Sequence, residues 1–179
     1  MIRPNTFGQK PRIHRSAYID PSAVIIGVVS IGKGVFVGPG AVIRADEPES
    51  AIRIGSECNI QDRVIVHALS GSTVNIREKV SLSHGCVVHG PCLIDKNTFI
   101  GFGSVVFNAV IGRNAFVKSL AVIENVKLPP GSLVKSKALI DSAAKLDELE
   151  MITAEQARFS DKVVKVNVNL AKGYKLLSV

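Results

Sequence analysis

Three of the four histidines in this 179-residue chain lie close together in sequence, at His67, His84 and His89. Three neutral imidazoles with an open fourth position form the arrangement of catalytic Zn²⁺ sites, where a bound water ionises near neutral pH. Imidazole also suits Fe²⁺ and Co²⁺. The stretch is therefore a candidate metal site, and the alternative is that each histidine is a solvated surface side chain. His14 stands apart and is interpreted as an ordinary surface residue.

Charged and amide side chains precede these histidines. Asp46 could pair with Arg44, within the chain or across a subunit interface, and the carboxylate of Glu47 could move protons. A solvated loop is the alternative for these charges. Asn59 and Gln61 supply amides, which can orient a hydroxide on a metal without changing the charge of the site.

A repeat of six residues between residues 19 and 127 sets the elements that must position these side chains. Within each run, every sixth residue is Ile, Val or Leu, and the residue four positions later is nearly always small or β-branched. The small position is held by Cys58, Cys86 and Cys92, and by Ser70. A period of six does not fit the 3.6-residue period of an amphipathic helix, whereas self-similarity at a hexapeptide period indicates a parallel β-helix.

The sequence therefore predicts an all-β solenoid: a left-handed parallel β-helix with a triangular cross-section and about five to six coils, one hexad to each side. Its handedness is that of known hexapeptide prisms. We expect the β-helix to occupy residues 1–134, with the repeats at 19–127, and a helical segment to occupy residues 135–179.

Two helices are expected in the second segment, at 136–149 and 154–177. A helix of this kind needs packing to be stable, so an apolar stripe of the second helix is expected to lie along the prism. The stripe consists of Phe159, Val163, Val166, Leu170 and Tyr174.

The phase of the repeat predicts where the special side chains point. The small position faces inward, so the three cysteines are expected in the core, and their odd number argues against a disulfide framework. His67 and His89 each follow a large aliphatic position and are three hexads apart, which places them on adjacent coils at one outward corner. Arg44 takes the same slot one coil earlier and Phe107 one coil later. His84 points elsewhere, so a three-histidine site needs a second subunit, and a trimer is the natural closed assembly.

Composition narrows the class of protein. Hydrophobic residues make up 46% and charged residues 21% of the chain, which excludes a disordered or fibrous protein. No apolar run is long enough for a signal peptide or a membrane span, so we expect a cytoplasmic protein without a membrane partner. The net charge of +7 permits nucleic acid, but the repeat and the histidines leave no need for it. We expect no nucleic-acid partner.

Four short runs together resemble the gamma-class carbonic anhydrases, a family of trimeric left-handed β-helices with metal sites between subunits. The runs are Ile43-Arg-Ala-Asp-Glu47, Asn59-Ile-Gln-Asp62, Val66-His-Ala-Leu69 and Val80-Ser-Leu-Ser-His84, the last leading into Val88-His-Gly-Pro91. The similarity extends from about Tyr18 to Tyr174. It implies reversible hydration of CO₂ to bicarbonate by a metal-bound hydroxide, with Zn²⁺, or Fe²⁺ or Co²⁺, in a homotrimer.

The resemblance also implies roles for single residues. His67, His84 and His89 match the metal ligands, with His84 coming from the adjacent subunit. Arg44 and Asp46 match an inter-subunit ion pair beside the site. Gln61 matches the residue hydrogen-bonded to metal-bound water, Asn59 a neighbour that helps to orient substrate, and Glu47 a carboxylate that takes part in proton movement.

One position departs from the family pattern. In the best-known archaeal form, a long acidic loop opens with a glutamate that shuttles protons, whereas here Ser70 stands there and the loop shrinks to residues 70–73. A serine does not carry a proton near neutral pH as a carboxylate does, so Glu47 or buffer must replace it, or the enzyme is slow. Two alternatives are a non-catalytic assembly scaffold and a hexapeptide acyltransferase, which would use one histidine as general base and bind a pantetheine arm between coils.

Overall fold

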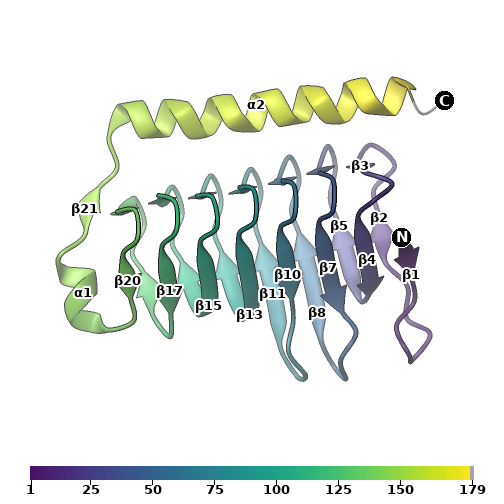
Figure 1. The fold of residues 1–179 in the computed structure, drawn as a ribbon, viewed down its shortest axis with the longest axis horizontal. Helices are drawn as coiled ribbons and strands as arrows, with labels where there is room; N and C mark the ends of the chain where they lie inside the picture. The colour runs from purple at the N-terminus through teal and green to yellow at the C-terminus, as the bar shows by residue number, and fades with distance from the viewer. Residues whose placement is uncertain (178–179) are drawn as a thin grey trace.

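Short strands joined by tight turns wind into a parallel β-solenoid of about seven turns, with one long helix lying alongside (Figure 1). This architecture comes from a computed structural model that describes residues 1–177. Successive strands along the chain lie on three faces in turn, and each strand pairs in parallel with the strand one coil away. The parallel β-helix predicted from the repeat is confirmed.

The three faces are numbered in chain order. Face 1 contains β1 (Ile2–Arg3), β4 (Val24–Gly27), β7 (Val42–Ala45), β10 (Ile65–His67), the first halves of β13 (Val87–Ile94) and β15 (Val105–Ile111), β17 (Val122–Glu124) and β20 (Leu139–Ile140). Face 2 contains β2 (Arg12–Ile13), β5 (Val29–Ile31), β8 (Ala51–Ile54), β11 (Thr73–Ile76), the second halves of β13 and β15, and β18 (Lys127–Leu128). Face 3 contains β3 (Tyr18–Ile19), β6 (Phe36–Val37), β9 (Asn59–Ile60), β12 (Ser81–Leu82), β14 (Phe99–Ile100), β16 (Phe116–Val117) and β19 (Ser132–Val134). The edges between them are called corner 1/2, corner 2/3 and corner 3/1.

The core is the inside of the prism. The large aliphatic positions stack on one another and are fully buried, as at Ile43, Ile60 and Leu82. The small inward positions include Cys58, Cys86 and Cys92, which are free thiols at most 4% exposed. Burial raises the pKa of Cys58 and Cys86 to about 12. The prediction that the cysteines are core residues is confirmed.

The number of coils and the inward phase differ from the sequence prediction in two places. The solenoid has about seven turns rather than five to six, because strands before residue 19 and after residue 127 add rungs. Ser70 is exposed rather than inward, because the insertion after β10 shifts the phase and Ala68 is buried instead.

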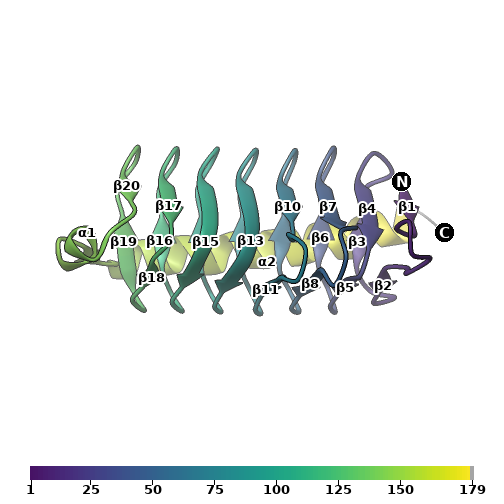
Figure 2. The ribbon, with the colours of Figure 1, turned by 90° about the horizontal axis from the view of Figure 1, so that it is seen from below.

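The helices also depart in part from the prediction. The first is only α1 (Ala143–Asp147), because residues 139–140 of the expected helix form β20. The second, α2 (Ala154–Leu177), has the predicted bounds and lies along face 3 over the length of the solenoid (Figure 2). Its buried side chains are Ser160, Val164, Asn167 and Ala171. Of the expected stripe, Phe159, Val163 and Tyr174 pack on side chains of face 3, whereas Val166 and Leu170 are exposed, so the expected packing is confirmed only in part. The division into 1–134 and 135–179 stays a prediction, and residues 178–179 lie outside the described part of the chain.

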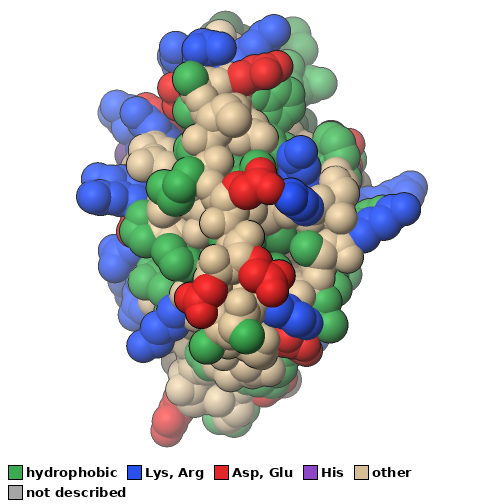
Figure 3. Space-filling model, turned by 90° about the vertical axis from the view of Figure 1, so that its left-hand side faces the viewer, with side chains coloured by type: hydrophobic (Ala, Val, Ile, Leu, Met, Phe, Trp, Pro, Cys, Tyr) green, Lys and Arg blue, Asp and Glu red, His purple; other side chains and the backbone are tan. Residues whose placement is uncertain are grey.

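The solenoid end that carries α1 is closed by a short reversed strand. β21 (Glu150–Met151) pairs with β19 in antiparallel fashion. Charged side chains of both signs spread over this end (Figure 3), and they include the ion pair of Lys135 Nζ with Glu150 Oε1 at 2.5 Å. Charges on an exposed edge discourage pairing with further strands. Among the described helices, none has the length and apolar character needed to cross a bilayer.

Candidate metal centre

His67 and His89 stack on adjacent rungs at the face 1 side of corner 1/2. β10 and β13 pair in parallel with His67 opposite His89, as the repeat predicts. His67 Nδ1 lies 3.0 Å from His89 Nε2. Arg44 is opposite His67 one rung earlier, and Phe107 is opposite His89 one rung later. The β-ladder thus brings two imidazole nitrogens together on the outside of the prism.

Two carboxylates approach the other ring nitrogen of His67. Nε2 lies 3.3 Å from Glu47 Oε1 and 3.7 Å from Asp46 Oδ1, in neither case with hydrogen-bond geometry. Arg44 Nη1 donates to Asp46 Oδ2 at 2.8 Å. The ion pair predicted between Arg44 and Asp46 therefore forms within one chain. It fixes the carboxylate beside His67.

The surroundings of His67 favour its neutral form. Burial of the ring lowers its pKa, and Arg44 and His89 lower it further, while Glu47 and Asp46 act in the opposite direction. A neutral imidazole keeps the lone pair that a metal ion requires. The local electrostatics therefore favour the form of His67 that can bind a cation.

Glu47 is positioned by the shortened loop after β10. The backbone N–H of Ser70 donates to Glu47 Oε2 at 2.7 Å, and Ser70 Oγ donates to the carbonyl oxygen of Pro48 at 3.1 Å. The other carboxylate oxygen faces His67. The loop thereby links the position that departs from the family pattern to a carboxylate beside the histidine pair.

His84 lies at corner 3/1, at the opposite edge of face 1 from the pair. Its Nδ1 is 3.3 Å from Asp62 Oδ2, and its ring stacks on Phe102 with centroids 5.6 Å apart. The side chain is about half exposed. Gln61 belongs to the neighbouring turn of the same corner. Sequence reasoning identified His84 and Gln61 but missed Asp62 as the partner of His84, although Asp62 is the last residue of the Asn-Ile-Gln-Asp run.

Asn59 lies apart from both groups. It is fully buried on face 3, where α2 covers the strands, and its Nδ2 donates to Ser81 Oγ at 2.6 Å. The structure therefore brings together Arg44, Asp46, Glu47, His67 and His89 at one corner, and His84 with Gln61 at another. Within one chain, Asn59 joins neither.

The donors at corner 1/2 are suited to part of a metal site. In the described residues, His67 Nε2, His89 Nδ1 and Asp46 Oδ1 are buried without a hydrogen-bond partner. The facing nitrogens are the other nitrogen of each ring, His67 Nδ1 and His89 Nε2, 3.0 Å apart. Two nitrogens bound to one tetrahedral ion at the usual distances would be about 3.3 Å apart, close to this separation. Residues 1–177 contain no group of three or more His, Cys, Asp or Glu side chains able to hold a metal ion. A three-histidine site therefore needs a second chain.

Faces 1 and 2 differ in the side chains that point outward. On face 1, the residues just before the buried aliphatic positions are all aliphatic and in register. They are Val24, Val42, Ile65, Val87, Val105, Val122 and Leu139. We call this row the face 1 stripe. Sequence reasoning missed it, although the residue before each repeat mark would have revealed it.

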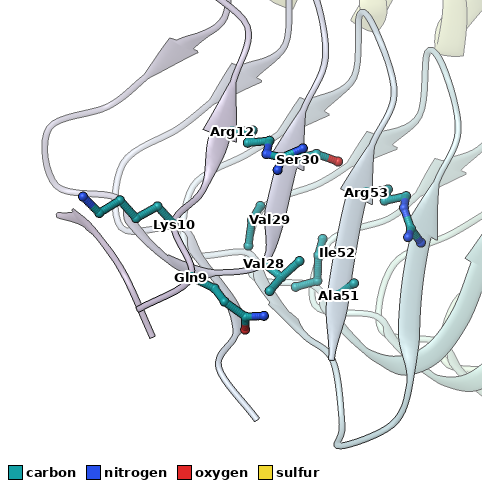
Figure 4. A pocket seen from close by; sticks show the side chains of 9 residues that line it. All are labelled: Gln9, Lys10, Arg12, Val28, Val29, Ser30, Ala51, Ile52 and Arg53. Atoms are coloured by element: carbon teal, nitrogen blue, oxygen red, sulfur yellow. The ribbon is translucent and has the colours of Figure 1, made fainter. Parts of the chain in front are cut away.

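The equivalent row on face 2 is largely polar at its N-terminal end. Arg12, Ser30 and Arg53 follow one another on successive rungs beside a surface pocket that Gln9 and Lys10 also line (Figure 4). None of the predicted site residues lines this pocket. The contrast indicates that face 2 is a solvent-facing surface at this end, whereas face 1 carries an uncovered apolar row between the two histidine corners.

Comparison with known proteins gives three results. A family model described as bacterial transferase hexapeptide (six repeats) matches residues 10–45. The chain is 36% identical to the carbonic anhydrase of Methanosarcina thermophila, over 92% of this chain and 75% of that protein. It is 38% identical to the carboxysome assembly protein CcmM of a Nostoc species over 91% of this chain, but spans only 31% of that protein.

Among solved structures, the chain resembles a putative acetyltransferase from Bacillus cereus. The sequence identity is 27%, the TM-score is 0.84, and the match covers 99% of this chain and 98% of the other. Proteins described as a carbonic anhydrase, an assembly protein and a putative acetyltransferase are therefore all similar to this chain. The choice between them rests on the site residues.

Proposed function

Because the chain belongs to the gamma-class carbonic anhydrase family of hexapeptide-repeat proteins, we propose that it catalyses the reversible hydration of CO₂ to bicarbonate and a proton. The observation that carries the proposal is the pair of facing nitrogens of His67 and His89, 3.0 Å apart. The proposed metal is Zn²⁺, with Fe²⁺ and Co²⁺ as alternatives that imidazole ligands also suit. The proposed location is the cytoplasm.

The third ligand in this proposal is His84 of a second subunit. His84 lies at corner 3/1 and the pair at corner 1/2, so corner 3/1 of one chain meets corner 1/2 of the next. Such a contact joins two different surfaces and forms a ring when the rotation closes. With triangular prisms, we propose a homotrimer with three shared sites.

The face 1 stripe supports this assembly. Face 1 lies between the two corners that meet, so in a closed ring it faces the symmetry axis. Its outward row is aliphatic on seven successive rungs, and Ile65 and Leu139 are 43% and 44% exposed in a single chain. Contiguous apolar surface of this kind marks an interaction site. Burying it at the axis would stabilise the trimer through the hydrophobic effect.

His67, His89 and a second subunit's His84 would hold the metal. When bound, an ion of this kind lowers the pKa of a water ligand and so supplies a nucleophile for CO₂ near neutral pH. Beside it, Arg44 holds Asp46 in place, and burial of the ring together with the charge of Arg44 keeps the pKa of His67 low. Gln61 of the second subunit lies at the same corner as His84, and its amide can orient a reactant without adding charge.

Proton movement is assigned to Glu47. Its Oε1 faces the histidine pair while its Oε2 accepts the Ser70 N–H, and the side chain is about one-third exposed. A carboxylate placed between a site and solvent can accept a proton from one side and release it to buffer on the other. Ser70 acts here as a positioning residue through its backbone.

A non-catalytic assembly role is the second candidate, favoured by the similarity to CcmM. The acyltransferase alternative accounts for the fold but leaves the paired histidines without a role. The facing nitrogens His67 Nδ1 and His89 Nε2, 3.0 Å apart at one outward corner, favour a metal site over either alternative.

The test is metal analysis of anaerobically purified protein together with stopped-flow CO₂ hydration. We expect about one divalent ion per chain and hydration activity that a chelator removes. Absence of both metal and activity after addition of Zn²⁺ or Fe²⁺ would refute the enzymatic proposal and favour the scaffold.

A further inference from the structure

Helix α2 leaves one apolar side uncovered. Phe159, Val166, Leu170 and Leu177 are separated by seven, four and seven residues, so they share one side of the helix at about 100° per residue. Their exposed fractions range from 41% to 81%. This α2 stripe lies about a quarter turn from the side that packs on face 3. A row of large apolar side chains of this kind calls for a covering surface.

The α2 stripe faces corner 3/1. The other flank of the helix lies against corner 2/3, because Asp161, Lys165 and Lys172 line one groove with Glu57 and Lys79 of that corner. The buried side of α2 separates this flank from the α2 stripe. The stripe must therefore face corner 3/1, which carries His84.

Corner 3/1 itself exposes two more large apolar side chains. Phe102 is 50% exposed and stacks on His84, and Leu120 is 56% exposed. The uncovered apolar surface on this side therefore includes both the α2 stripe and the immediate neighbour of His84.

The middle of the α2 stripe lies at the level of the histidine pair. Phe159 packs on Phe99 and Phe116 with centroids 5.4 and 6.0 Å apart. Nearer the other end of the helix, Tyr174 packs on Tyr18 of β3 at 4.8 Å. Val166 and Leu170 fall between these contacts, beside β9 and β12, whose chains continue through corner 3/1 into β10 and β13.

We propose that the α2 stripe packs against the two corner loops of a second copy of this chain, residues 46–50 and 68–72. The inference rests on the proposed shared site, in which a neighbour's corner 1/2 must lie beside corner 3/1. The loops after β7 and β10 extend further from the solenoid than the turns at later rungs (Figure 1). They are therefore the parts of a neighbour best placed to reach α2.

The chemistry of the loops fits the helix. Pro48 is exposed and Leu69 partly so, and both offer apolar contact. The first loop also carries the carboxylates of Asp46, Glu47 and Glu49, whereas Lys162 flanks the outer edge of the α2 stripe. Opposite charges around an apolar centre favour one docking orientation. The helix of one subunit thereby holds the loop that presents Glu47 in the next.

Cross-linking between differently labelled chains tests the contact. A tagged Leu170→Cys chain and an untagged Pro48→Cys chain are coexpressed and treated with a short bis-maleimide. We expect a covalent dimer containing one of each, while the native cysteines stay unreactive because they are buried. Lys165→Cys replaces Leu170→Cys as the matched control, since Lys165 lies on the corner 2/3 flank, and should give no such product.

A second experiment measures the strength of trimer association. Leu170→Asp should weaken trimer association about tenfold or more, and Lys165→Asp should leave it unchanged. Trimers that bind metal but neither cross-link through Leu170 nor respond to Leu170→Asp would overturn this inference and leave the proposed function standing. A monomeric, metal-free wild type would overturn both.

Discussion

The backbone N–H of Ser70 and the carboxylate of Glu47 form a 2.7 Å hydrogen bond across two neighbouring corner loops. Ser70 occupies the position where the family resemblance places a proton-carrying glutamate. Here the same position secures a carboxylate from the previous coil, whose other oxygen lies 3.3 Å from His67 Nε2. The short loop has no carboxylate of its own at this position, but its backbone holds the carboxylate of Glu47 beside His67.

Replacing Glu47 tests its role in proton movement. Glu47→Gln should lower the rate of CO₂ hydration by roughly 100-fold in dilute buffer, because an amide does not exchange the proton. Concentrated imidazole buffer should restore part of the rate, and the metal content should not change. Stopped-flow measurements at two buffer concentrations check both effects.

Ser70→Ala is the matched control for that variant. It retains the N–H that binds Glu47 and loses only the hydroxyl that donates to Pro48. Its rate should stay close to that of the wild type. A full rate for Glu47→Gln in dilute buffer would remove Glu47 from the proton path.

Mixing two metal-free variants tests the shared site. His67→Ala and His84→Ala should each bind metal roughly 100-fold or more weakly, since each deletes a ligand. In randomly mixed trimers, about a quarter of the sites would join an intact pair to an intact His84 and recover metal. Metal analysis of the separated and mixed proteins gives the result. If all three ligands came from one chain, the mixed proteins would not recover metal binding. His14→Ala is the control and should retain metal in every sample.

A charge in the face 1 stripe tests assembly at the axis. Ile65→Asp should weaken trimer association about tenfold or more, because it would place a carboxylate in an apolar contact. Asn75→Asp adds the same charge on face 2 and should have no effect. Sedimentation over a range of protein concentrations distinguishes the two. Equal behaviour of the two variants would exclude face 1 from the interface.

The charges at corner 1/2 predict how the pKa of His67 changes when Arg44 is replaced. Arg44 is one of the causes that lower the pKa of His67, after burial of the ring. Arg44→Gln removes that positive charge, so the pKa should rise and the imidazolium should form at higher pH. Proton NMR titration of the metal-free protein measures the change. Arg53→Gln, on face 2, serves as the control, and a fall in the pKa in Arg44→Gln would contradict this account.

The sequence by itself determined the solenoid and the stacking of His67 on His89. Both follow from the period of six, because a repeat of that length makes every third hexad a neighbour across the ladder. It also predicted that His84 points to another corner and that the cysteines are inside, since inward and outward positions alternate along a strand.

Where the hexapeptide repeat is interrupted, it did not predict which side chains point inward or where the strands end. The insertion after β10 turned Ser70 outward and Ala68 inward, because extra residues at a corner shift the phase by an amount that spacing alone does not reveal. Residues 139–140 became β20 rather than helix because pairing with β17 satisfied their backbone.

Only the tertiary structure decided which side of α2 is buried and what the carboxylates contact. The helical period predicted an apolar stripe. The side of α2 that is buried against face 3 instead contains Ser160, Val164, Asn167 and Ala171, whose small or short side chains allow the helix to approach the strands closely. The contacts of Glu47 with His67 and Ser70 join different coils. Such contacts depend on how the rungs stack and on where each corner loop folds, which local sequence does not specify.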